Sequence, residues 1–91
     1  PMVTVSKKNI KKFSEIEKTL KREKTKLIEI RKYIENNFEY VGTDFSKKVR
    51  EIYYDDKSKK TIYGTTTSEE RKELLDEGID LLTIPWVTKD N

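Results

Sequence analysis

The chain has 91 residues, enough for one small domain with a modest core. It contains no cysteine and no histidine, which excludes disulfide bonds and thiol catalysis and removes the commonest metal ligand and general base. Charged residues make up 41% of the chain, yet its net charge is only +3, and no apolar run reaches the ~18 residues of a membrane span. We therefore expect a cytoplasmic protein without metal, cofactor or membrane contact.

The first predicted element is a long helix over residues 6–37, a stretch without Gly or Pro and rich in good helix formers. Ser6 is its expected N-cap and Asn37 its expected end. Residues 2–5, ahead of this helix, fit either a short strand or a disordered lead-in. A heptad register places one apolar seam along the helix, with polar interruptions. The seam residues are Phe13, Ile16, Leu20, Leu27, Ile30 and Ile34.

The length of this helix favours self-association. Nine turns span roughly 48 Å, whereas a typical strand spans only about 20 Å. Such a helix must project beyond a small sheet, and an overhang that carries apolar seam positions tends to pair with another copy of itself. We therefore predict a homo-oligomer, with a dimer as the first expectation, held together by the seam residues.

Three strands are predicted after the long helix. FEYV at 38–41 is followed by KKVREIYY at 47–54, which has the strongest strand composition, and by TIYG at 61–64. The polar residues 56–59 would connect the last two strands as a hairpin. Neither face of that hairpin is clearly polar, so we expect both faces to be at least partly covered.

A second helix is predicted from Ser68, because Thr67 and Glu70 have the spacing of a capping box. Gly78 is the expected C′ residue, the left-handed glycine that commonly follows the last turn of a helix. DLLTI at 80–84 is then predicted to be a buried strand.

The predicted fold is α+β, with the element order α-β-β-β-α-β in a single domain over residues 1–91. The long N-terminal helix at 6–37 comes first. A small, mostly antiparallel sheet of three or four strands and the short second helix fill residues 38–91.

No catalytic motif is present. The predicted element order is also the core order of the PD-(D/E)xK nucleases, which hold Mg²⁺ with an Asp and a D/E-x-K triple. Asp44 and Glu51 are the available carboxylates, but Tyr53 stands where that triple requires Lys. We therefore predict that the protein is not an enzyme.

Two binding functions are left open. Tyr53, Tyr54 and Trp86 belong to the residue types enriched at interface hot spots, which favours a protein-binding regulator, adaptor or inhibitor. Small Lys/Glu-rich proteins of this kind include those encoded by phages and mobile elements.

The alternative is a nucleic-acid-binding module. Residues 1–37 hold eleven basic and five acidic side chains, a net charge of +6, although the basic ones are spread around the helix. The candidate phosphate contacts are Lys11, Lys18 and Arg22 on the helix, and Lys57, Lys59 and Lys60 in the hairpin turn.

Overall fold

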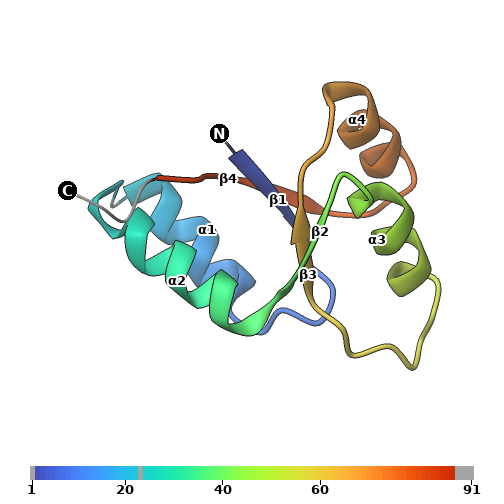
Figure 1. The fold of residues 1–91 in the computed structure, drawn as a ribbon, viewed down its shortest axis with the longest axis horizontal. Coiled ribbons are helices and arrows are strands. Elements are labelled where there is room, and N and C mark those ends of the chain that lie inside the picture. The colour runs from blue at the N-terminus through green and yellow to red at the C-terminus, as the bar shows by residue number, and fades with distance from the viewer. Residues whose placement is uncertain (1, 23, 88–91) are drawn as a thin grey trace.

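A mixed four-stranded sheet lies at the centre of the computed structural model, which describes residues 2–22 and 24–87 (Figure 1). The strands are β1 (Met2–Ser6), β2 (Glu39–Gly42), β3 (Ile62–Gly64) and β4 (Leu81–Pro85). Their order across the sheet is β2-β3-β1-β4. β1 pairs antiparallel with both β3 and β4, and β2 pairs parallel with β3.

Helices cover both faces of this sheet. They are α1 (Phe13–Arg22), α2 (Leu27–Asn37), α3 (Phe45–Tyr53) and α4 (Ser68–Asp76), with a 3₁₀ turn, η1 (Lys24–Lys26), between the first two. α1 and α2 lie on one face, and α3 and α4 lie on the other (Figure 1). Within the described residues, none of the helices is both long and apolar enough to cross a membrane.

The predicted long helix over 6–37 is wrong. The chain begins with strand β1, and Ser6 is the last residue of that strand rather than a helix cap. A loop over residues 7–12 follows, in which Asn9 has a left-handed φ of 71°. The helical part then folds back on itself at η1, so α1 and α2 lie side by side (Figure 1).

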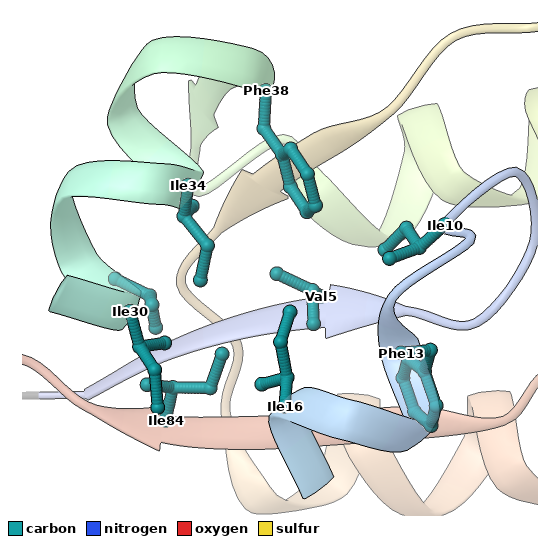
Figure 2. Close-up of a cluster of buried hydrophobic side chains, with 9 residues drawn as sticks. Val5, Ile10, Phe13, Ile16, Ile30, Ile34, Phe38 and Ile84 are labelled. Carbon is teal, nitrogen blue, oxygen red and sulfur yellow. The ribbon is translucent and has the colours of Figure 1, made fainter. Parts of the chain in front are cut away.

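Burial explains the fold-back. The apolar stripes of α1 and α2 both face the same side of the sheet, where they close one hydrophobic core over β1 and β4 (Figure 2). A straight helix of roughly 48 Å would exceed the longest dimension of the molecule, 39 Å, and would extend beyond the sheet that covers its apolar stripe. The core consists of Val3, Val5, Ile10, Phe13, Ile16, Ile30, Ile34, Phe38 and Ile84.

The predicted strand over 47–54 is also wrong, because this stretch belongs to helix α3. Phe45, Val49 and Ile52 are spaced by four and three residues, which places them on one helical face, and all three are buried. With no strand there, the predicted hairpin does not exist. β3 pairs with β1 and β2 instead.

Helix α4 confirms the prediction made from local signals. The Thr67 hydroxyl accepts a hydrogen bond from the backbone N–H of Glu70 (3.1 Å), and the Glu70 carboxylate accepts one from the N–H of Thr67 (2.8 Å). Gly78 has a φ of 89°, and the Ile79 N–H donates to the Leu74 carbonyl oxygen (3.0 Å), which closes a Schellman turn.

A second hydrophobic core lies between the sheet and the α3/α4 layer. Its buried members are Phe45, Val49, Ile52, Ile62, Leu74 and Ile79. The protein is therefore α+β, as predicted, but its order is β-α-α-β-α-β-α-β, and it starts with a strand rather than a long helix.

Candidate functional site

Two loops that are far apart in the sequence lie side by side in the fold. The first, residues 7–12, joins β1 to α1; the second, residues 54–61, joins α3 to β3 (Figure 1). The Asn9 side-chain amide joins them, because its Nδ2 donates to the carbonyl oxygens of Ser58 (3.1 Å) and Lys60 (3.0 Å). These partners are 49 and 51 residues away from Asn9 in the chain.

Lys8 makes the second connection between the loops. Its Nζ donates to the carbonyl oxygens of Ile52, Tyr53 (3.3 Å) and Asp55 (2.8 Å). These carbonyls belong to the last turn of α3 and the residues after it, where the negative end of the helix dipole lies; the Ile52 oxygen also accepts from the Asp55 N–H (3.2 Å). Lys8 therefore has a structural position, and its charge is directed into the protein.

A shallow, open groove lies where the two loops meet; it is lined by Lys7, Asn9, Ile10, Lys11 and Lys59 and has a volume of about 440 Å³. We call this the basic groove. The three lysines that line the groove are exposed at the surface. Two more exposed lysines, Lys12 and Lys57, belong to the same two loops but do not line the groove. The groove therefore presents several ammonium groups around a concave surface.

The two loops carry the net positive charge of the chain, although they hold only seven of its twenty basic residues. Residues 7–12 and 54–61 contain seven lysines and two aspartates, a net charge of +5, whereas the whole chain has a net charge of +3. The remaining residues therefore carry a net charge of −2. A concave surface with one dominant sign of charge concentrates counter-ions and steers charged ligands toward itself.

Three aromatic rings form a row beside the α1/α2 layer. Tyr40 on β2 lies 5.1 Å from Tyr63 on β3, between ring centroids, and Tyr63 lies 5.5 Å from Trp86, which follows β4. The Arg31 guanidinium of α2 lies 4.9 Å from the centroid of the Trp86 ring, a cation–π contact. Tyr40, at the open end of the row, is 59% exposed.

The family model described as "Protein of unknown function (DUF1178)" matches residues 2–89. The chain belongs to the DUF1178 family. No curated protein and no solved structure matches the chain. Because the family description states no activity, the function of this DUF1178 member has to be inferred from its geometry.

The candidate phosphate contacts divide into three groups. Lys11 and Lys59 line the basic groove, and Lys57 is exposed on the same loop as Lys59. Lys60 lines a neighbouring hollow together with Glu39 and Glu51, so its charge lies among acidic groups.

Lys18 and Arg22 are exposed on α1 but do not line the groove. Sequence reasoning missed Lys7 and Asn9. Asn9 was the residue that could have indicated the loop. Asn adopts left-handed backbone geometry more readily than most residues, which argues against a continuous helix through this position.

The candidate protein-binding residues are not brought together. Tyr53 and Tyr54 lie at the end of α3, where their rings are 5.0 Å apart and the Tyr53 hydroxyl donates to the Gly78 carbonyl oxygen (3.3 Å). Trp86 packs against the core beneath α1 and α2, on the opposite face of the sheet. The three residues therefore do not form one surface.

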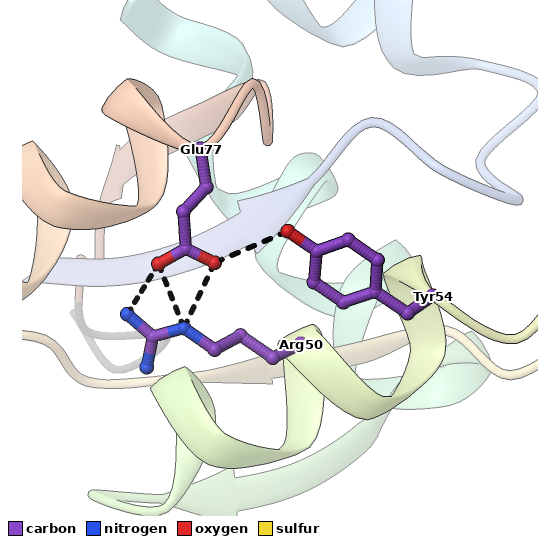
Figure 3. A network of polar contacts seen from close by, with 3 residues as sticks. All are labelled: Arg50, Tyr54 and Glu77. Atoms are coloured by element: carbon purple, nitrogen blue, oxygen red, sulfur yellow. Dashed lines mark hydrogen bonds and ion pairs between the residues drawn. The ribbon is translucent and has the colours of Figure 1, made fainter.

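Tyr54 takes part in a polar network between the ends of α3 and α4 (Figure 3). The Arg50 guanidinium donates from Nε (2.9 Å) and Nη2 (2.7 Å) to Glu77 Oε2, and the Tyr54 hydroxyl donates to Oε1 (3.5 Å). Hydrogen bonding to Arg50 lowers the pKa of Glu77, and the same bond raises the pKa of Arg50. This network connects two helices and faces no cavity identified above.

The predicted oligomerisation residues lie against the chain's own sheet. Phe13, Ile16, Ile30 and Ile34 are buried in the core, and Leu20 and Leu27 are half-buried and pack against it. Among the described residues, no cluster of three or more His, Cys, Asp or Glu is placed to hold a metal ion.

Proposed function

We propose that this protein binds nucleic acid through the basic groove. The observation that supports the proposal is the connection made by Asn9, which brings Lys7 and Lys11 next to Lys59 from a loop about fifty residues away. Lysine ammonium groups around a groove are suited to phosphate oxygens, which account for most protein–nucleic acid contacts.

The arrangement favours a preformed site. Asn9 and Lys8 bind backbone carbonyl oxygens of the opposite loop and of the end of α3, so the loop backbones are already held together before a ligand arrives. A preformed site pays less ordering entropy on binding than two independent loops would. The chain has no histidine and no cysteine, so we propose binding without catalysis.

Fluorescence anisotropy with labelled DNA and RNA oligonucleotides, at about 50 and 200 mM salt, tests the proposal. If about four phosphates are contacted, affinity for a duplex falls roughly 100-fold between the two salt concentrations. The variant K7Q/K11Q/K59Q removes three charges from the groove and should bind much more weakly, with a smaller salt dependence.

The matched control is K32Q/K47Q/K72Q, which removes three exposed lysines outside the groove. If both triple variants lose oligonucleotide affinity equally, the basic groove is not the specific binding site, because the affinity then depends only on the net charge of the protein. Absence of binding at about 50 mM salt would contradict nucleic-acid binding altogether.

A protein partner, self-association and a cytoplasmic location stay predictions. Capture experiments with Y53A/Y54A and W86A variants would test the first, although these residues lie on opposite faces of the sheet. The solution mass of the unaltered chain tests the second, and a mass of one chain at all concentrations would contradict the predicted dimer.

A further inference from the structure

Tyr40 is an exposed aromatic side chain with a supported position. Its ring packs against Tyr63, and its ring atoms lie near 3.8 Å from the place where a Cβ atom would stand on Gly42. β2 is the edge strand of the sheet that residues 2–22 and 24–87 form. Tyr63 and Gly42 therefore support the Tyr40 ring, while 59% of the surface of Tyr40 remains accessible to solvent.

The loop that carries Lys59 leads directly into the strand that carries Tyr63. Lys59 and Tyr63 are four positions apart, so at most roughly 13 Å of extended chain, or about four stacked nucleotides, separates them. Two hydrogen bonds attach the end of this loop to the last residue of α2 and the first residue of β2. The Thr61 hydroxyl donates to the Asn37 carbonyl oxygen (3.1 Å), and the Glu39 N–H donates to the Thr61 carbonyl oxygen (3.0 Å).

We propose that Tyr40, supported by Tyr63, stacks with a base of a single-stranded nucleic acid whose phosphates occupy the basic groove. This inference rests on the proposed function and specifies its ligand. An aromatic ring needs the open face of an unpaired base, whereas the bases of a duplex are stacked on one another. Positive charge next to an exposed ring is the combination that single-stranded nucleic acid recognises.

Charge distinguishes this ligand from a protein partner. Tyrosine is also common at protein interfaces, but the residues that line the basic groove are three lysines and an asparagine, with Ile10 as the single apolar side chain. A polyanion satisfies both features, because its backbone neutralises the lysines while its bases cover the ring.

The test combines variants of Tyr40 with oligonucleotides that lack bases. Y40L keeps an apolar side chain but removes the ring, and Y40F keeps the ring as the matched control. Each is titrated by anisotropy with a 12-nucleotide DNA strand, the RNA strand of the same length, the DNA duplex, and an abasic DNA strand of the same length. Thermal unfolding of each variant verifies that the fold is retained.

We expect the single strands to bind more tightly than the duplex at the same salt concentration. Y40L should weaken single-strand binding by about 5- to 150-fold, the range for loss of one stacked base, whereas Y40F should change it less than about 2-fold. The abasic strand should bind weakly, and Y40L should have no further effect on it, because both changes remove the same interaction. The DNA and RNA arms show whether the sugar matters.

Two outcomes would overturn the inference. If Y40L binds like the unaltered protein while K7Q/K11Q/K59Q fails to bind, stacking is wrong and phosphate binding stands. If the duplex or the abasic strand binds as tightly as the intact single strand, the bases are not read by Tyr40. Failure of every oligonucleotide to bind would instead overturn the proposed function together with this inference.

Discussion

Gly64 on β3 stands so close to Gly42 on β2 that a Cβ atom at Gly64 would lie 2.4 Å from the Gly42 carbonyl oxygen. The same Cβ atom would lie 3.0 Å from the Cβ of Phe45 at the start of α3. Gly64 therefore allows the edge strand and α3 to approach β3 together.

We predict that Gly64→Ala destabilises the protein by about 3 kcal/mol, at the upper end of the range for overpacking, because a backbone oxygen must move to admit the methyl group. Urea unfolding monitored by circular dichroism measures the change. Ser14→Ala, at an exposed position of α1, is the control and should stay within about 0.5 kcal/mol of the unaltered protein. Equal midpoints for G64A and the unaltered chain would contradict the close approach.

Lys8 is predicted to contribute to stability rather than to ligand binding. Lys8→Met keeps the aliphatic length but removes the ammonium group that binds the carbonyl oxygens of Ile52, Tyr53 and Asp55. Loss of these charge-assisted hydrogen bonds at a helix C-terminus should cost about 1–3 kcal/mol. The same change at exposed Lys11 should leave the unfolding free energy nearly unchanged, and an equal effect at both sites would argue against a special position for Lys8.

The Arg50–Glu77 pair predicts a pH dependence of stability. Because hydrogen bonding to Arg50 lowers the pKa of Glu77 in the folded protein, the folded state holds the ionised carboxylate more strongly than the unfolded chain does. This stabilising contribution is fully present above the ordinary Glu pKa of 4.5, and it is lost as the pH falls through the lowered value.

Glu77→Gln should therefore be destabilising at pH 7, and the difference from the unaltered protein should disappear near pH 2. Thermal unfolding at both pH values measures it, with Glu51→Gln at an exposed position of α3 as the control. A Glu77→Gln effect of the same size at both pH values would show that lost packing, rather than the ion pair, is responsible.

Ile34 distinguishes a core role from an interface role. Ile34 is fully buried within a single chain, so Ile34→Ala should cost about 2–5 kcal/mol by cavity formation. In a monomer that cost and the melting temperature do not depend on protein concentration. A melting temperature that rises with concentration would instead indicate stabilisation by association.

Local signals were sufficient where a structure depends on neighbouring residues. The capping box of Thr67 and Glu70 and the left-handed Gly78 correctly defined α4, because each hydrogen bond involved joins residues less than six positions apart. The strands expected at 38–41, 61–64 and 80–84 are present at 39–42, 62–64 and 81–85, with ends that differ by no more than one residue.

Helix α3 was within reach of the sequence and was missed. Phe45, Val49 and Ile52 repeat at helical spacing, but the predicted strand begins at Lys47, and Val49 and Ile52 alone do not distinguish a helix from a strand. The β-branched and aromatic residues that favoured a strand are placed here on a helix that the second core requires.

The sequence by itself determined that residues 13–22 and 27–37 are helical, that Thr67 caps a helix and that the chain is α+β, because these depend on propensity and short-range hydrogen bonds. Only the tertiary structure decided that the first helical stretch folds back, since that reversal depends on both apolar stripes sharing one sheet face. The basic groove likewise required the fold. Its lysines come from loops about fifty residues apart, and they meet because Asn9 and Lys8 bind carbonyl oxygens that only the folded chain brings within reach.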